Sequence, residues 1–185
     1  MTSESTVDKY HQLLALVASF KRVIVALSGG LDSSFLLCSV VKGIGAENTL
    51  AAIGVSPSLA STELEDAKSV ALDCGLRSEQ IMLISTEEIG DVNYSSNPPN
   101  RCFFCKSELY HKLNALATER NHEVICDGAN ASDIGDHRPG MKAAAENKVR
   151  SPLLEVGLNK DEIRELAKEF GLKFWDKPQS ACLSS

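Results

Sequence analysis

The sequence predicts an α/β fold in which helices cover both faces of a parallel sheet. Short runs of apolar and β-branched residues alternate with stretches of helical periodicity along the 185 residues. Strands that are separated by helices form right-handed βαβ units, and these units build parallel sheets. Because domains usually run ~100–200 residues, we expect residues 1–185 to form a single Rossmann-like domain.

Three helices and three strands are expected before residue 85. Apolar residues at Leu13, Leu14 and Val17 share one face of a leading helix, whereas unbroken apolar runs predict buried strands. Thr62 and Glu65 resemble a capping box, and Gly75 is a helix-ending residue. The expected order is a helix over Val7–Phe20, a strand over Arg22–Leu27, a helix over Ser33–Val41, a strand over Thr49–Val55, a helix from Thr62 to Gly75 and a strand over Gln80–Ile84.

The second half begins with a long irregular stretch at 85–100, and such loops in small domains tend to be functional. Pro152 confines the strand expected around it to an edge of the sheet. Asn159 and Glu162 predict a capped last helix that Gly171 ends. The expected order is a helix over Phe103–Arg120, a strand over Val124–Cys126, a loop over Asp127–Asn130, a helix over Met141–Asn147, an edge strand over Val149–Leu154 and the last helix.

Composition and charge exclude several classes of protein. Apolar residues make up 43% and charged residues 24% of the chain, which argues against disorder and low complexity. No apolar run approaches the ~20 residues that span a bilayer, and no basic segment precedes an apolar stretch at the N-terminus. The net charge of −6 disfavours broad nucleic-acid binding. We therefore expect a cytoplasmic protein that binds neither membrane nor nucleic acid.

The segment Ser28-Gly-Gly-Leu-Asp-Ser-Ser34 lies between the first strand and the next helix and predicts a phosphate site. Glycines let backbone N–H groups approach a phosphate, and a helix N-terminus adds unpaired N–H groups and a positive dipole end. The segment lacks the lysine and spacing of a Walker loop. An acidic residue suits such a loop only if it orients the backbone or holds Mg²⁺. The candidate phosphate-binding residues are Ser28, Gly29, Gly30, Asp32, Ser33 and Ser34.

Three of the six cysteines form a candidate metal or sulfur site. Cys102 and Cys105 are spaced to share a helix face, and Cys182 lies far along the chain. A structural zinc site normally has four ligands, whereas three thiolates leave one iron of a cluster open. A metal or cluster site, a redox pair and incidental cysteines all remain open on the residues alone. Disulfides are rare in a reducing cytosol, so the other cysteines are expected to be unbridged: Cys38 and Cys126 as core residues and Cys74 as an inert residue before Gly75.

Ser28–Ser34 resembles the PP-loop of the ATP pyrophosphatases, which implies an adenine nucleotide alpha-hydrolase-like PP-loop domain that splits ATP into AMP and pyrophosphate. Further motifs, in order along the chain, resemble the LarE family of ATP-dependent sulfur transferases, which serves nickel-pincer nucleotide biosynthesis for lactate racemase. These motifs are Pro99-Asn-Arg-Cys-x-x-Cys-Lys106, Asp127-Gly-Ala-Asn-Ala-Ser-Asp133, Gly135-Asp-His-Arg-Pro-Gly140, Arg150-Ser-Pro-Leu153 and Trp175-Asp-Lys-Pro-x-Ser-Ala-Cys-Leu183.

The resemblance implies a small-molecule substrate, pyridinium biscarboxylic acid mononucleotide, whose carboxylate is adenylated before sulfur replaces AMP. Two sulfur donors occur in the family. In one, a cysteine at the position of Cys182 gives up its sulfur. In the other, three cysteines, here Cys102, Cys105 and Cys182, hold a [4Fe-4S] cluster that carries an extra sulfide, and this pattern favours the cluster form. We expect the cofactors ATP, Mg²⁺ and the cluster, with these three cysteines as catalytic and metal-binding residues.

Other site residues follow from the same reading. Gly128 and Asn130 are expected to contact adenosine, and Gly54 and Ser56 to cradle the adenine. Arg101 is a candidate for holding phosphate or carboxylate. Family members assemble as a hexamer, which predicts a homo-oligomer. They also continue past the Ala-Cys-Leu motif, so residues 172–185 read as the start of a C-terminal segment that looks truncated here.

Three alternatives remain. An amide-forming synthetase of the NAD synthetase type would use ammonia and would not need the cysteines. A tRNA thiolase would need an RNA-binding surface, against which the net charge of −6 counts. A non-catalytic nucleotide sensor or zinc-stabilised module would release no pyrophosphate.

Overall fold

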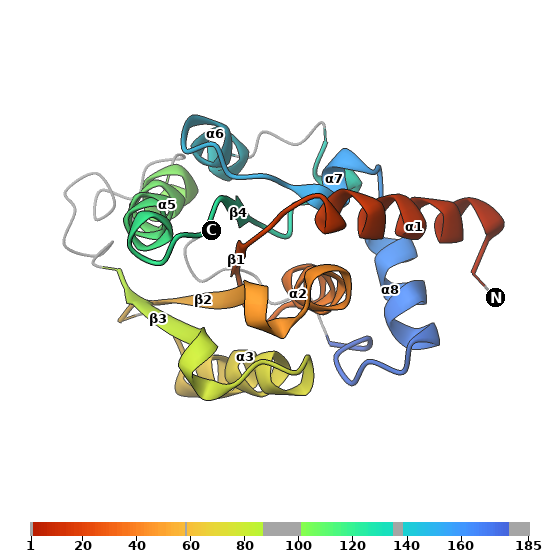
Figure 1. Ribbon diagram of the computed structural model, residues 1–185, viewed down its shortest axis with the longest axis horizontal. Helices are drawn as coiled ribbons and strands as arrows, with labels where there is room; N and C mark the ends of the chain where they lie inside the picture. The colour runs from red at the N-terminus through yellow and green to blue at the C-terminus, as the bar shows by residue number, and fades with distance from the viewer. Residues whose placement is uncertain (1, 58, 87–100, 135–138, 178–185) are drawn as a thin grey trace.

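The computed structural model describes residues 2–57, 59–86, 101–134 and 139–177 (Figure 1). The side chains of Arg101, Cys102 and Pro139 lie outside this description. So do the predicted loop at 85–100 beyond Thr86 and the C-terminal residues from 178 onwards, including Cys182.

The described strands form one parallel sheet in the order β3-β2-β1-β4, which confirms the predicted α/β class. The strands are β1 (Val23–Ala26), β2 (Thr49–Val55), β3 (Ile81–Ser85) and β4 (Val124–Cys126). Val23 of β1 lies opposite Thr49 on one side and Val124 on the other, so the carboxyl ends of these strands share an edge. The strand order reverses between β1 and β4. In open parallel sheets, ligands bind at the carboxyl edge beside such a reversal.

Helices cover both faces of the sheet, and each face has its own apolar core (Figure 1). One face packs against α1 (Glu4–Ala18), α2 (Leu31–Ile44), α3 (Ser61–Asp73), α7 (Pro152–Glu155) and α8 (Lys160–Glu169). The other packs against α5 (Arg101–Glu119) and α6 (Pro139–Glu146). Short 3₁₀ turns lie at Ala46–Asn48, Ser78–Gln80 and Ala131–Asp133. Val23 and Val25 face the first core and Ile24 the second, as the two-residue repeat of a strand requires.

The capped last helix was predicted correctly. The Asn159 side chain accepts a hydrogen bond from the Glu162 N–H at 2.9 Å, and Glu162 accepts one in return from the Asn159 N–H at 2.9 Å. Ile163, Leu166 and Ala167 are buried on the inner face of α8. These local contacts depend on residues three positions apart, which is why the sequence could predict them.

Two local predictions were wrong. Thr62 and Glu65 do not cap α3, because that helix begins one residue earlier and Ala60 occupies the capping position without a side-chain bond. The expected edge strand over Val149–Leu154 is only a single bridge between Cys126 and Arg150, followed by α7. Pro152 is the first residue of that helix, a position that suits proline because its missing N–H would be unpaired there.

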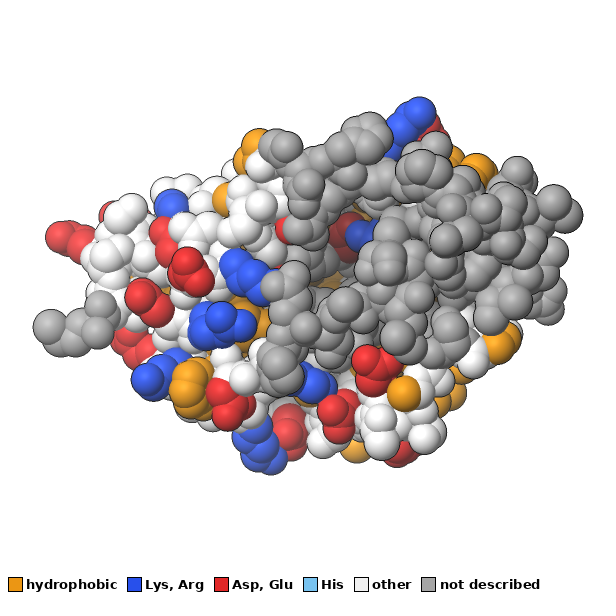
Figure 2. Space-filling view, turned by 180° about the vertical axis from the view of Figure 1, so that it is seen from behind, with side chains coloured by type: hydrophobic (Ala, Val, Ile, Leu, Met, Phe, Trp, Pro, Cys, Tyr) orange, Lys and Arg blue, Asp and Glu red, His pale blue; other side chains and the backbone are white. Residues whose placement is uncertain are grey.

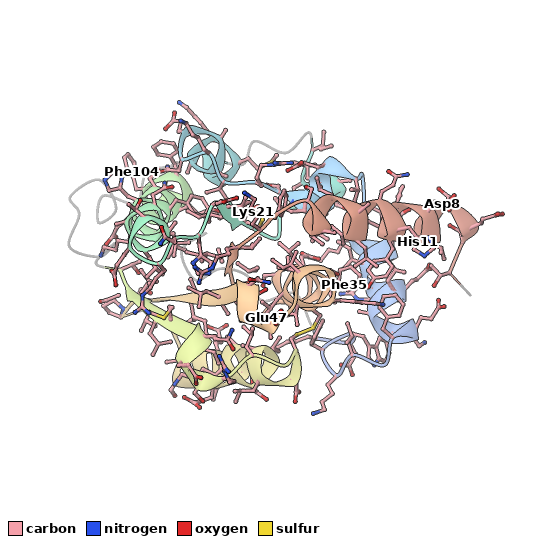
Figure 3. All side chains as sticks on the ribbon, viewed as in Figure 1. Asp8, His11, Lys21, Phe35, Glu47 and Phe104 are labelled. Atoms are coloured by element: carbon pink, nitrogen blue, oxygen red, sulfur yellow. A yellow bond between two sulfur atoms is a disulfide. The ribbon has the colours of Figure 1, made fainter. Side chains whose placement is uncertain are left out.

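The prediction that Cys38 and Cys74 are unbridged was also wrong. The two form a disulfide between the middle of α2 and the C-terminal end of α3, visible as the yellow bond between these helices in Figure 3. Their Cα atoms lie 5.1 Å apart, within the usual range for a disulfide. The two cysteines are separated by 36 positions in the sequence, and no pattern in that segment reports the contact, because it arises only when α3 packs against α2. Cys126 is fully buried in β4, as predicted.

Among the described residues, no helix is both long enough and apolar enough to cross a membrane.

Candidate functional site

The predicted phosphate loop follows β1 at the carboxyl edge of the sheet. Gly29 has φ +78°, a left-handed conformation that favours glycine. A Cβ added to Gly29 would lie 3.0 Å from the Cβ of Ala67, so α3 supports this side of the loop closely. Gly30 caps α2 and accepts a hydrogen bond from the Ser34 N–H at 3.1 Å. The N-terminal N–H groups of α2 therefore point toward the loop, where a helix dipole favours an anion.

The serine hydroxyls of the loop hold its shape. The hydroxyls of Ser28 and Ser33 lie 3.0 Å apart, and Ser33 also accepts a hydrogen bond from the Ser28 N–H at 3.2 Å. Ser34 is buried, and its hydroxyl has no hydrogen-bond partner among the described residues. An orphaned hydroxyl of this kind is unusual in a folded protein. It is consistent with the predicted contact to phosphate, which stays a prediction.

The turn after β4 packs directly on the phosphate loop. A Cβ added to Gly128 would lie 2.7 Å from the Ser33 backbone nitrogen and 2.9 Å from its Cα, so only glycine fits there. Asn130 is 1% exposed, and its side-chain oxygen accepts a hydrogen bond from the Ser132 N–H at 2.9 Å. The structure thus brings Gly128 and Asn130 to the loop, while their contact with adenosine remains an expectation.

Asp127 joins three elements at this edge. Asp127 is buried, and its carboxylate accepts hydrogen bonds from the Tyr110 hydroxyl of α5 and the Ser151 hydroxyl, each at 2.7 Å. The Ala129 N–H also donates to it at 3.2 Å. Lys106 of α5 places its Nζ 3.9 Å from the same carboxylate. A buried carboxylate is tolerated only with such partners, so Asp127 fixes α5 against the turn after β4.

Asp32 stands at the start of α2 with an incomplete set of partners. Its Oδ1 is buried and has no hydrogen-bond partner among the described residues, whereas Oδ2 lies 4.0 Å from Nζ of Lys160. Burial raises the pKa of this carboxyl above 3.8, although Lys160, Arg164 and a hydrogen bond from Asn130 lower it. An orphaned carboxylate oxygen beside a phosphate loop fits the chemistry of Mg²⁺, which prefers oxygen ligands. Asp32 therefore fits the predicted Mg²⁺ site.

We expect Asp32→Asn to make the protein more stable at neutral pH. A pKa that is raised on folding means that the folded state binds more protons, so stability falls as pH rises from 3.8 through the folded pKa. The amide removes that loss, and the gain should vanish below pH 3.8. Thermal unfolding of both proteins across this pH range measures the effect. A wild type whose stability rises over the same range relative to the variant would contradict it.

Three lysines surround the loop, and none was singled out from the sequence as a site residue. Lys177 donates a hydrogen bond to the Gly29 carbonyl at 3.1 Å and pairs with Asp66 of α3 at 2.8 Å. Lys106 and Lys160 pair with Asp127 and Asp32 as described. Lys106 and Lys177 stand inside the quoted Cys-x-x-Cys-Lys and Trp-Asp-Lys-Pro motifs, which was the signal available for them. On the face seen in Figure 2, basic and acidic side chains are interspersed rather than gathered into one basic patch.

The remaining predicted site residues are placed only in part. Gly54 and Ser56 lie at the carboxyl end of β2, at the same edge as the loop. Cys105 is half-buried near the start of α5, one residue before Lys106. The backbone of Arg101 and Cys102 belongs to the same helix, but their side chains and Cys182 lie outside the described residues. Within the described residues, no cluster of three or more metal-ligating side chains occurs.

Comparison with known proteins first identifies the class. Residues 5–116 match the family model described as NAD synthase. An NH3-dependent NAD synthetase from Campylobacter jejuni has the same fold, with a TM-score of 0.72 and 18% identity over 95% of this chain and 79% of that chain. An NMN synthetase from Francisella tularensis gives a TM-score of 0.70 and 18% identity over 96% and 76%. Fold and loop together define a PP-loop protein of the NAD synthase family.

Relatives with higher sequence identity identify the family within this class. An uncharacterized protein of Synechocystis sp. is 42% identical over 96% of this chain and 65% of its own length. The pyridinium-3,5-bisthiocarboxylic acid mononucleotide synthase of Lactiplantibacillus plantarum is 32% identical over 94% of this chain and 62% of its own length. Within the PP-loop class, the chain belongs to the LarE family. It spans less than two thirds of the length of either relative.

Proposed function

We propose that this protein is an ATP-dependent sulfur transferase that acts on pyridinium biscarboxylic acid mononucleotide. ATP adenylates a carboxylate of this substrate and releases pyrophosphate; sulfur then replaces AMP to give a thiocarboxylate. The Lactiplantibacillus plantarum relative, whose name describes a bisthiocarboxylic product, supports this substrate class. A PP-loop supports the use of ATP.

One observation carries the proposal: the cysteine-bearing end of α5 and the phosphate loop lie at the same edge of the sheet. Lys106 follows Cys105 directly and reaches Asp127, whose neighbour Gly128 packs on the loop. At the other side of the loop, Lys177 contacts Gly29 five positions before Cys182. A thiolate or sulfide delivered from these segments would meet an acyl-AMP formed at the loop.

Different residues of the chain would have different roles in this reaction. The backbone around Gly29 and Gly30 and the N-terminus of α2 would bind the leaving pyrophosphate, because their N–H groups favour anions. Lys106 and Lys177 would counter the charge of the substrate and the phosphates. Asp32 would hold Mg²⁺, and the ion would supply positive charge against the phosphates. Adenylation makes the carboxylate oxygen part of a good leaving group, which a sulfur nucleophile can then displace.

For the sulfur source, we propose a [4Fe-4S] cluster held by Cys102, Cys105 and Cys182. Cys102 and Cys105 lie one turn apart on α5, a spacing that suits a shared ligand site. When bound, such a cluster supplies sulfide on the iron that lacks a protein ligand. The second candidate is Cys182 itself as the donor, and both candidates place this thiol beside the reaction.

Sulfur transfer is tested with full-length protein prepared without air and given ATP, magnesium and the substrate. We expect AMP, pyrophosphate and a product in which one oxygen is replaced by sulfur, measured by chromatography and mass spectrometry. Cys182→Ala should lose the sulfur product and keep pyrophosphate release, because adenylation does not need the thiol. Cys126→Ala is the matched control, since its thiol is buried in β4 and should leave the product unchanged.

The same samples separate the alternatives. Iron and acid-labile sulfide that are lost in Cys102→Ala and Cys105→Ala support the cluster. Dehydroalanine at position 182 after turnover, without iron, supports the sacrificial cysteine instead. Ammonia-dependent amide formation that persists without the three cysteines would refute sulfur transfer and favour a synthetase of the NAD synthetase type.

A further inference from the structure

The Cys38–Cys74 disulfide joins two helices that both support the phosphate loop. Cys38 lies on α2, whose N-terminus follows the loop directly, and Cys74 is the C-terminal cap of α3. α3 supports the loop in two places: Ala67 fits against Gly29, and Asp66 holds Lys177, which contacts the Gly29 carbonyl. Figure 3 shows the disulfide between α2 and α3. A covalent bond thus fixes the helix against which the loop is seated.

Both cysteines are only partly buried, so neither residue is enclosed in the core. Cys38 and Cys74 are half-buried at the margin of the first core. Cys74 ends α3, and Gly75 follows with φ +96° before the chain turns to Leu76. Next to it, Asp73 pairs at the surface with Lys173 at 3.0 Å. Asp73 and Gly75, on either side of Cys74, are exposed, so this end of α3 lies at the protein surface.

We propose that Cys38–Cys74 is a thiol–disulfide exchange site for a dithiol reductant of the thioredoxin class, and that its redox state sets the nucleotide affinity of the phosphate loop. One thiolate of the reductant attacks a sulfur of the disulfide and forms a mixed disulfide, releasing one cysteine thiolate. The second reductant thiol displaces the other cysteine. The reductant ends as a disulfide, and Cys38 and Cys74 each end as a thiol.

The disulfide is coupled to nucleotide affinity because the phosphate loop packs closely against α3. Without the bond, apolar packing and the Asp66–Lys177 pair remain to hold α3 against the loop. The Gly29 backbone approaches Ala67 so closely that an added Cβ would lie only 3.0–3.3 Å from Ala67 atoms. A small displacement of α3 therefore moves the backbone that binds phosphate. The reduced protein should bind nucleotide more weakly. This inference rests on the nucleotide binding assigned in the proposed function.

The test is calorimetric titration of the full chain with a non-hydrolysable ATP analogue, before and after reduction with dithiothreitol. Mass spectrometry of alkylated protein reports the state of Cys38 and Cys74 in each sample. We expect the dissociation constant to rise at least about five-fold on reduction, the lower end of typical coupling between sites. Cys38→Ser and Cys74→Ser should each show the weaker affinity in both samples, with circular dichroism confirming that they are folded.

Two control variants test whether the change in affinity depends on the Cys38–Cys74 disulfide. The double variant C38S/C74S should not respond to dithiothreitol; a response there would assign the effect to other cysteines and overturn the proposal. Lys173→Ala breaks the neighbouring ion pair at the end of α3 without changing a thiol, and it should keep the full response. Equal affinity in oxidised and reduced wild type would refute redox control of the loop, and a bond that resists the reductant would refute the exchange site; either result leaves the proposed function standing. Absence of nucleotide binding in both states would refute both.

Discussion

Gly128→Ala is expected to weaken ATP binding by about ten- to a hundred-fold. The new Cβ would lie 2.7 Å from the Ser33 backbone nitrogen. No rotamer change relieves this contact, because the position of a Cβ is fixed by its own backbone and the nitrogen belongs to the backbone of Ser33. Either the turn after β4 or the phosphate loop must shift. Displacements near 1 Å in a positioned site can cost about 10²-fold. Calorimetric titration with a non-hydrolysable ATP analogue measures the loss.

A variant of a second glycine distinguishes a loss of stability from a loss of nucleotide binding. Gly157→Ala adds a methyl group into open space but forces φ +71° on alanine, so it should cost about 1–2 kcal/mol of unfolding free energy and leave nucleotide affinity unchanged. Overpacking at Gly128 should cost a similar ~1–3 kcal/mol. If both variants lose stability but Gly128→Ala binds ATP as well as wild type, the turn after β4 does not shape the loop.

What the sequence predicted well depends on residues that are close together in the chain. The strand, glycine turn and helix around Ser28–Ser34 lie within one continuous segment, and so does the capping box of Asn159 and Glu162. Periodicity and spacing report such contacts directly. The sheet was predictable because alternating strands and helices leave few topologies.

What the sequence could not predict depends on packing between distant segments. The fit of Gly128 on Ser33 and the Lys177–Asp66 pair each join parts of the chain about a hundred residues apart. The capping motif at Thr62 failed for a local reason, because the helix begins one residue before it. Pro152 was consistent with an edge strand and with a helix start, and only the fold decides between them.

The pairing of Cys38 with Cys74 is another contact between distant segments that the sequence could not predict. The residues alone offered a reason to leave Cys38 and Cys74 unbridged, since disulfides are rare in reducing compartments. No spacing rule connects a mid-helix cysteine with a cysteine at the end of the next helix. The packing of α3 on α2 brings their Cα atoms to 5.1 Å, and this distance permits the bond.

Loss of the Cys38–Cys74 bond is expected to lower the free energy of unfolding by about 3–4 kcal/mol, because a cross-link spanning 36 residues restricts the unfolded chain. For a chain of this length, each kcal/mol corresponds to about 2–4 °C, so the melting temperature should fall by about 10 °C. Thermal unfolding of oxidised wild type, reduced wild type and the double variant C38S/C74S measures this. The reduced wild type and the double variant should have the same melting temperature, and dithiothreitol should not change that of the variant.

Lys173→Ala, which breaks an exposed pair beside the bond, should stay within about 0.5 kcal/mol of wild type. A reduced protein that melts with the oxidised one would mean that native packing already fixes α3, and the redox control of the loop would lose its physical basis as well.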